Sequence, residues 1–106
     1  MSVKITRNNL SAETDNKITV IDFWAPWCNP CKMMEPVMNK MEEQFSEDIH
    51  FGQINVDGNE DIAESYKVMG LPSIVLFKNG KAVEKVTGLY SSEKMAHYLN
   101  RKLDEV

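Results

Sequence analysis

Two cysteines, Cys28 and Cys31, are the residues of this 106-residue chain whose type and spacing point most directly to chemistry. They stand in a Cys-x-x-Cys arrangement within residues 22–36, which read DFWAPWCNPCKMMEP and also hold both tryptophans. Two cysteines this close in sequence can form a disulfide with each other, and a thiolate of the pair can attack a disulfide in another molecule. The spacing therefore favours thiol–disulfide exchange.

The cysteines fall where a predicted strand gives way to a predicted helix. Residues 18–23 form an apolar, β-branched run typical of a strand covered on both faces. The apolar residues that follow at the spacing of one helical face are Met34, Val37, Met38, Met41 and Phe45. Because a helix N-terminus stabilises a thiolate, Cys28 is expected to attack. Cys31, one turn further on and expected to be more covered, would resolve the mixed disulfide.

Other elements must hold this stretch in place. Strand patterns are expected at residues 3–5, 18–23, 49–56, 73–78 and 81–87. Helices are expected within residues 7–17, where the pattern is weak, from residue 28 to residue 45, near residues 61–66, and after a capping Ser91. Asn79-Gly80 suits a hairpin turn, and Pro36 should bend the long helix. This order predicts an α/β fold with a single central mixed sheet of about five strands, an antiparallel C-terminal hairpin and helices on both faces.

Length and composition limit the classes of function. A chain of 106 residues suits one compact domain, here residues 1–106, and 42% hydrophobic with 26% charged residues is typical of a soluble globular protein. A net charge of -4 and a sequence pI of about 5.1 argue against nucleic acid or a membrane surface as partner. The N-terminal residues MSVKITRNNL lack the apolar segment of a secretion signal, so a cytoplasmic location is expected.

Metal binding is the main competing use of the cysteine pair. A closed zinc site needs four ligands, and His50 and His97 are the only histidines available to complete it. One is expected to open a strand and the other to lie on the last helix, so both are predicted to be solvated surface residues. We therefore expect no metal and no bound cofactor, with the Cys28–Cys31 dithiol and disulfide as the redox group.

The segment DFWAPWCNPCK resembles the signature of the thioredoxin family, and LPSIVLFKNG and the glycine of TGLY are similar to later motifs of that family. The residues that stand at family spacing beside the cysteines are Asp22, Trp24, Trp27, Pro36, Pro72, Gly80 and Gly88. The resemblance spans nearly the whole chain and implies the thioredoxin fold. It also implies a protein-disulfide reductase that acts on disulfide-containing proteins and is recharged by an NADPH-dependent thioredoxin reductase. We expect the chain to be a monomer.

The resemblance also implies roles for individual residues. Asp22 would lie buried beneath Cys31 and carry its proton, with a pKa raised by burial. Pro72 would follow a cis peptide bond beside the cysteines. The shallow surface that receives partners would consist of Trp27, Gly70, Leu71, Pro72, Gly88 and Leu89. Trp24 would be a core residue. From the residues themselves, Pro30 suits a first helical turn, and Lys32 can support the thiolate.

Two residues depart from the family pattern. Asn29 makes the motif WCNPC in place of the usual WCGPC, and the two residues between the cysteines affect redox poise, so a more oxidising thiol oxidase or isomerase stays an alternative. Gln53 stands where many thioredoxins carry a lysine near the buried aspartate, and its neutral side chain is predicted to leave Asp22 protonated to higher pH. A thioredoxin-fold binding or adaptor module is the second alternative.

Overall fold

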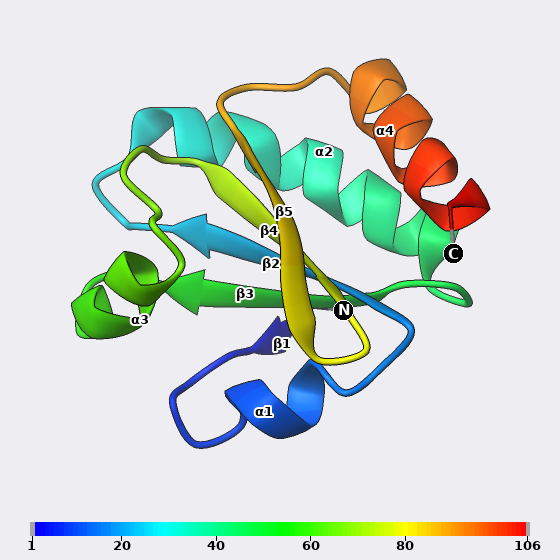
Figure 1. Cartoon of the computed structure of the whole chain (residues 1–106). Helices are drawn as coiled ribbons and strands as arrows, with labels where there is room; N and C mark the ends of the chain where they lie inside the picture. The colour runs from blue at the N-terminus through cyan, green and yellow to red at the C-terminus, as the bar shows by residue number, and fades with distance from the viewer. Residues whose placement is uncertain (1, 106) are drawn as a thin grey trace.

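Five strands form one mixed sheet in the computed structural model, which describes residues 2–105 (Figure 1). The strands are β1 (Val3–Lys4), β2 (Ile18–Trp24), β3 (His50–Asn55), β4 (Ser73–Lys78) and β5 (Lys81–Thr87). The helices are α1 (Leu10–Glu13), α2 (Asn29–Phe45), α3 (Glu60–Ser65) and α4 (Ser92–Asp104). The strand order is β1-β3-β2-β4-β5, so β2, which leads into the cysteines, is the central strand.

The pairing of the strands is mixed, as predicted. β1 and β2 both run parallel to β3, whereas β4 is antiparallel to β2 and to β5. At the tip of the β4–β5 hairpin, Asn79 and Gly80 have φ values of 52° and 85°, the left-handed conformation that a two-residue hairpin turn requires. The predicted antiparallel hairpin is therefore confirmed.

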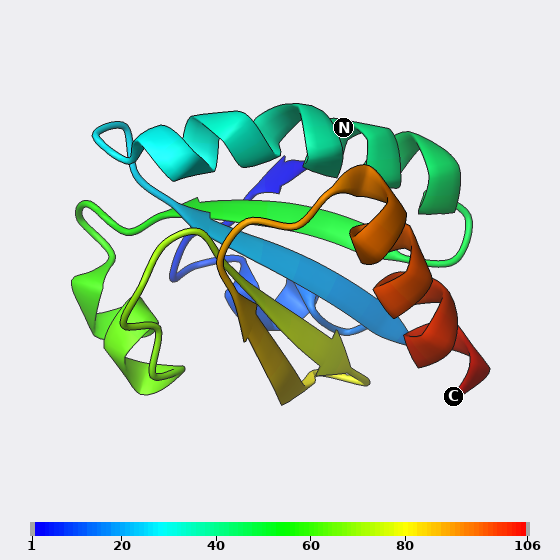
Figure 2. The ribbon, with the colours of Figure 1, turned by 90° about the horizontal axis from the view of Figure 1, so that it is seen from above.

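Helices cover both faces of the sheet (Figures 1 and 2). α2 and α4 pack on one face through a core that includes Met34, Met38, Met95 and Leu99. α1 and α3 lie on the other face, over a second core that contains Ile21, Phe23, Ile54, Ile62 and Phe77. β2 is thus buried on both faces, which explains its continuous apolar run. Within residues 2–105, no helix combines the length and the apolar character needed to cross a membrane.

The structure gives the bounds of the two helices α1 and α2 that the sequence predicted only approximately. The weakly patterned segment 7–17 holds the four-residue helix α1, and its Thr14 caps the turn by donating its hydroxyl to the carbonyl of Leu10. α2 runs from Asn29 to Phe45 as a single helix that includes Pro36. Proline at that position removes one intrahelical hydrogen bond, while the apolar face of α2 remains buried against the sheet.

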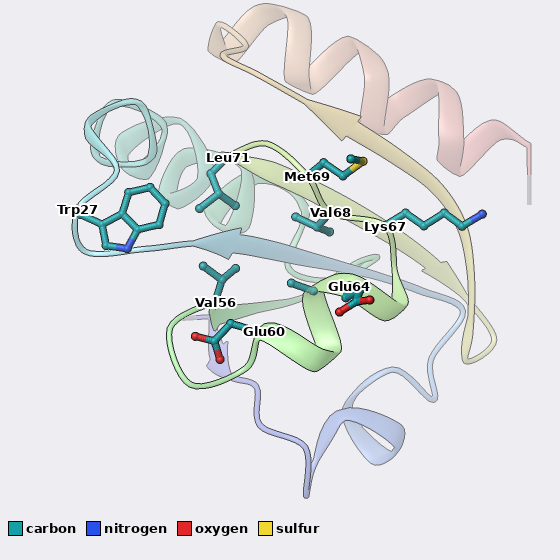
Figure 3. Close-up of a pocket in the computed structure, with 9 residues that line it drawn as sticks. Trp27, Val56, Glu60, Glu64, Lys67, Val68, Met69 and Leu71 are labelled. Atoms are coloured by element: carbon teal, nitrogen blue, oxygen red, sulfur yellow. The ribbon is translucent and has the colours of Figure 1, made fainter.

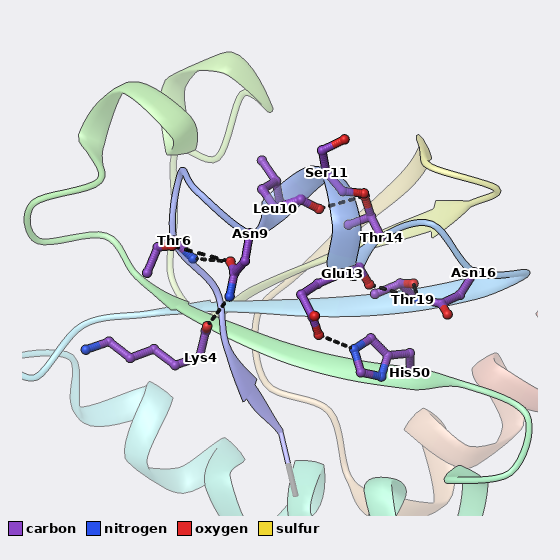
Figure 4. Close-up of polar contacts among 10 residues, drawn as sticks. All are labelled: Lys4, Thr6, Asn9, Leu10, Ser11, Glu13, Thr14, Asn16, Thr19 and His50. Atoms are coloured by element: carbon purple, nitrogen blue, oxygen red, sulfur yellow. Dashed lines mark hydrogen bonds and ion pairs between the residues drawn. The ribbon is translucent and has the colours of Figure 1, made fainter.

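One histidine departs from its prediction. His97 is exposed, but His50 is half-buried and its Nε2 lies 2.8 Å from Oε1 of Glu13 (Figure 4). The reason is the parallel register, which sets the start of β3 beside Thr19 of β2, next to the segment that follows α1. His50 therefore ties α1 to the sheet, at the end of β3 remote from the cysteines.

Candidate active site

The cysteine pair lies where the central strand leads into α2. Cys28 is the N-cap of α2, and its Sγ accepts a hydrogen bond of 3.2 Å from the backbone N–H of Cys31. Pro30 occupies the first turn, where a missing N–H costs little. The two residues form a disulfide with their Cα atoms 5.3 Å apart, within the usual range for such bonds. The predicted placement of Cys28 at a helix N-terminus is confirmed.

Both cysteines are buried in this disulfide form. Cys28 is 5% exposed and Cys31 is 7% exposed, so the expectation that Cys31 is the more covered of the two is wrong for this state. The disulfide draws both sulfurs into one small apolar cluster with Ala25, against Trp24 and Leu71. Trp24 is half-buried on this cluster rather than enclosed in the main core. The prediction that Cys28 attacks therefore depends on its N-cap position and not on exposure.

The loop that precedes β4 packs beside the cysteines. Its Leu71–Pro72 peptide bond is cis, as the resemblance to the thioredoxin family implied, and Leu71 contacts the cysteine cluster. The carbonyl of Pro72 accepts a hydrogen bond of 2.9 Å from the N–H of Gly88. Gly88 has a φ of 104°, a conformation that favours glycine, and this explains the residue type. The carbonyl oxygen of Gly70, in the same loop, accepts a hydrogen bond of 2.5 Å from the hydroxyl of Ser73, the first residue of β4.

Figure 3 shows an apolar groove of about 500 Å³. It lies beside the disulfide, because Val56 and Leu71 of its lining also pack against the cysteine cluster. It is lined by Trp27, Val56, Glu60, Ala63, Glu64, Lys67, Val68, Met69 and Leu71. Trp27 is 66% exposed and Met69 is 94% exposed, so large apolar side chains face solvent here. Of the residues predicted for the partner surface, Trp27 and Leu71 line this groove, while Leu89 is 51% exposed next to Gly88.

Trp27 has a polar partner that the sequence analysis missed. Its indole Nε1 donates a hydrogen bond of 3.1 Å to Oδ1 of Asp57. Asp57 follows the end of β3, which is parallel to β2, so the two strand ends bring this carboxylate next to the loop before α2. The parallel strand order was the signal available for this contact. No feature of the sequence indicated that Met69 would line the groove.

A second pocket of about 310 Å³ lies on another side of the disulfide and reaches Asp22. We call it the polar pocket because four polar side chains, Asp22, Lys32, Glu35 and Gln53, contribute to its lining. It is lined by Asp22, Trp24, Ala25, Pro26, Cys31, Lys32, Glu35 and Gln53. Among residues 2–105, Oδ1 of Asp22 is the buried side-chain oxygen that has no hydrogen-bond partner. Burial first, and then the negative charge of the nearby Glu35 carboxylate, together raise the pKa of Asp22 to about 7. A carboxyl group with this pKa can accept and release a proton near neutral pH.

The second departure from the family pattern lies in the same pocket. Gln53 stands opposite Asp22 in the β2–β3 register, and both side chains line the polar pocket. Its amide is neutral, so it does not offset the burial of Asp22. Lys32 and Asn29 are exposed at the start of α2. Glu35 is the pocket residue that the sequence analysis missed, although its place four residues after Cys31 put it on the same helix face.

The alternative of a metal site has no arrangement to support it in the part of the chain that the structure describes. There, no group of three or more histidine, cysteine, aspartate or glutamate side chains is arranged to hold a metal ion. His50 pairs with Glu13, and His97 lies on α4.

Comparison with known proteins gives one consistent result. The thioredoxin family model matches residues 2–101. The thioredoxin of Bacillus subtilis is 37% identical over 101 residues, covering 95% of this chain and 97% of that protein. The thioredoxin of Staphylococcus aureus is 34% identical over 101 residues, with the same coverage of 95% and 97%.

Solved structures agree. A mutant thioredoxin from Halobacterium salinarum superposes with a TM-score of 0.87 at 34% identity, covering 94% of this chain and 88% of that chain. A second chain superposes with a TM-score of 0.81 at 30% identity, covering 99% of this chain and 95% of that chain. It comes from a structure described as the basis of the thiol resolving mechanism in yeast mitochondrial 1-Cys peroxiredoxin via glutathione/thioredoxin systems.

The fold, the disulfide at a helix N-terminus and the relatives therefore lead to the same conclusion. This chain belongs to the thioredoxin family and is a thiol–disulfide oxidoreductase whose redox-active pair is Cys28 and Cys31.

Proposed function

We propose that this oxidoreductase works as a protein-disulfide reductase. The observation that carries the proposal is the position of the pair, with Cys28 as the N-cap of α2 and Cys31 on the wall of the pocket that holds Asp22. A helix N-terminus stabilises the Cys28 thiolate, which is the form that attacks. A base near the second cysteine is what the resolving step requires.

The reaction has two steps. In the first, the Cys28 thiolate bonds to one sulfur of a partner disulfide, and the other partner sulfur leaves as a thiolate that takes a proton from solvent. In the second, Asp22 accepts the proton of the Cys31 thiol, and Cys31 Sγ bonds to Cys28 Sγ. The bond between Cys28 and the partner then breaks, and the second partner sulfur leaves with its electron pair. Two electrons have passed to the partner, and the Cys28–Cys31 disulfide remains.

The apolar groove supports a role in binding protein partners. Disulfide-containing proteins expose the segment around their cysteines, and we propose that such a segment lies across Trp27 and Leu71, against the cis Leu71–Pro72 bond, with Gly70, Gly88 and Leu89 at its edge. A large exposed aromatic beside a shallow apolar groove is a typical binding anchor.

The remaining parts of the proposal follow from a reductase cycle. The oxidised pair must be recharged, and an NADPH-dependent thioredoxin reductase is the partner that we propose for this step. A reductase needs a reducing compartment, which supports a cytoplasmic location. We further propose that the chain acts as a single-domain monomer with no bound cofactor.

Asn29 supports a second candidate, a more oxidising thiol oxidase or isomerase. It lies exposed between the cysteines, where a change in thiolate stabilisation alters the reduction potential, and about 30 mV corresponds to about 1.4 kcal/mol for this two-electron couple. Equilibration of the pair with glutathione buffers separates the two candidates. A potential near about -270 mV, which is typical of thioredoxins, supports the reductase, whereas one in the range of about -120 to -180 mV, typical of oxidases and isomerases, supports the alternative.

Insulin reduction with dithiothreitol tests the reductase directly. Wild-type protein is expected to accelerate the reduction, and Cys28→Ser is expected to abolish the acceleration because the attacking sulfur is lost. Cys31→Ser should instead accumulate a mixed disulfide with insulin, visible on a non-reducing gel. Absence of turnover by folded wild-type protein would contradict the reductase and favour a binding or adaptor module.

A further inference from the structure

Glu35 lies on α2 one helical turn after Cys31. Side chains four residues apart share a helix face, so Glu35 stands on the same face of α2 as the resolving cysteine. Both side chains line the polar pocket, together with Asp22 of β2 and Gln53 of β3. The proposed reaction assigns roles to Cys31 and Asp22 but none to Glu35.

Two hollows meet at Asp22. The first is the polar pocket beneath Cys31, and the second is a smaller hollow of about 150 Å³. The second hollow is lined by Ser2, Asp22, Glu35, Met38, Asn39, Phe51, Gly52 and Gln53. Asp22, Glu35 and Gln53 are common to the two hollows. Asp22 contributes the buried oxygen without a partner and Gln53 a neutral amide, so Glu35 is the charged side chain that borders Asp22 on both sides.

No positively charged side chain borders Asp22 in both hollows as Glu35 does. Two residues of α2, Lys32 and Glu35, line the polar pocket with Asp22. Across the sheet, Asp22 is level with Gln53 of β3, Lys4 of β1 and Ile74 of β4. Ile74 and Gln53 carry no charge. Lys4 is exposed on the far side of Gln53, and Lys32 borders the first hollow but not the second. In keeping with this geometry, the Glu35 carboxylate adds to burial in raising the pKa of Asp22.

We propose that Glu35 is a positioning residue for the exchange reaction, which favours the protonated form of Asp22 and so sets the pH range over which Asp22 takes the proton of Cys31. The inference rests on the proposed function of Asp22 as proton acceptor. In that step the proton passes from Cys31 Sγ to Asp22, and Cys31 Sγ bonds to Cys28 Sγ. The partner sulfur leaves with the electron pair of the broken bond. Glu35 touches none of these atoms and acts through the basicity of Asp22.

An NMR titration of the Asp22 side-chain carboxyl carbon in the oxidised protein tests the coupling. Glu35→Gln is expected to move the midpoint to lower pH, by on the order of half a pH unit for the loss of one partly screened charge. Glu35→Asp keeps a carboxylate and should restore much of the wild-type midpoint. Glu47→Gln is the matched control, because Glu47 is exposed beyond the end of α2 and lines neither hollow. It should leave the midpoint unchanged.

The pH profile of insulin reduction, measured on the same variants, separates the inference from the proposed function. If Glu35→Gln moves the Asp22 midpoint and the turnover profile together, the inference stands. An unchanged midpoint overturns it, whatever the activity. A moved midpoint with an unchanged turnover profile overturns the role of Asp22 in catalysis instead, and with it the functional part of the inference, while leaving the electrostatic coupling in place. Because Gln is a good helix former at an exposed position, these variants should fold.

Discussion

The two hollows next to the Cys28–Cys31 disulfide differ in kind. The groove beside Trp27 is open and walled largely by apolar side chains, with Met69 almost fully exposed. The pocket beneath Cys31 is smaller and holds Asp22, whose buried Oδ1 has no hydrogen-bond partner. The first suits contact with a partner, and the second suits the handling of a proton. In the proposed mechanism, the disulfide thus lies between a binding surface and a proton site.

This difference has a kinetic consequence. A side chain that contacts the partner contributes binding energy, so its loss is expected to raise KM. A side chain that acts on Cys31 affects the resolving step, so its loss is expected to lower kcat and to change the pH profile. Variants on the two sides of the disulfide should therefore differ in their kinetics. A groove variant that lowered kcat, or a pocket variant that raised only KM, would contradict this division.

The largest effect is expected on the stability of the oxidised protein in Asp22→Asn. The pKa of Asp22 is about 7 in the folded chain against 3.8 for a solvated aspartate, so the folded state binds more protons than the unfolded state between these two pH values. The contribution of Asp22 to the free energy of unfolding is fully present below about pH 4 and is lost as pH rises to about 7. The loss is on the order of 4 kcal/mol before allowance for solvent in the pocket. Asn has no charge to bury, so this loss should be absent.

Urea unfolding at about pH 5 and about pH 8 measures this effect. Asp22→Asn should be more stable than the wild type at the higher pH, with a smaller difference at the lower pH. A wild-type stability that does not fall over this range would show that Asp22 is not held in a pocket that disfavours its charge.

On the groove side, Trp27→Ala should raise KM for a protein substrate. Loss of an exposed aromatic anchor costs about 2 kcal/mol at typical binding sites, which is about 30-fold. The change should leave kcat near the wild-type value, because Trp27 is absent from the proton pocket. Steady-state insulin reduction gives both constants. Met33→Ala is a control, since Met33 is also exposed but lines neither hollow. A fall in kcat with constant KM would contradict the division.

Asp57→Ala should have a smaller effect on the same side. It removes the acceptor that fixes the Trp27 ring but leaves the ring itself. A hydrogen bond to a charged group contributes about 1.5 to 3 kcal/mol when enclosed and less when exposed, as here, so KM should rise several-fold. The indole N–H resonance of Trp27 should also shift. An unchanged resonance would show that the bond is not formed in solution.

The smallest effect is expected on the pocket side in Gln53→Lys. A cation opposite Asp22 favours the ionised carboxyl, so the pKa of Asp22 should fall from about 7. NMR titration of the Asp22 carboxyl checks this, with Asn39→Lys, at the edge of the smaller hollow, as a more remote added charge. Identical titrations in the wild type and Gln53→Lys would contradict the account of Gln53.

The sequence predicted the binding side and the proton side unequally. Trp27, Pro72 and Asp22 were predicted for the site because they stand at family spacing. The hairpin was predicted correctly because Asn79-Gly80 has one preferred turn geometry. Glu35 was missed because its role depends on what faces it across the pocket, which a helical pattern does not reveal. Asp57 looked like an ordinary turn residue, since its contact with Trp27 arises from strand order. Relative exposure of the cysteines was misjudged, because the disulfide ties both sulfurs into one cluster.

The central claim is that Asp22 takes the proton of Cys31 during resolution, and single-turnover kinetics test it most directly. Reduced wild-type protein and Asp22→Asn are mixed with saturating peptide disulfide from about pH 5 to about pH 9, and tryptophan fluorescence follows formation of the Cys28–Cys31 disulfide. The pKa of Asp22 is about 7 in the disulfide form, so the wild-type rate of resolution should rise through an ionisation near neutral pH. Asp22→Asn should lack this step and rise only toward the usual cysteine pKa of about 8.5. Superimposable pH profiles for the two proteins would contradict the claim.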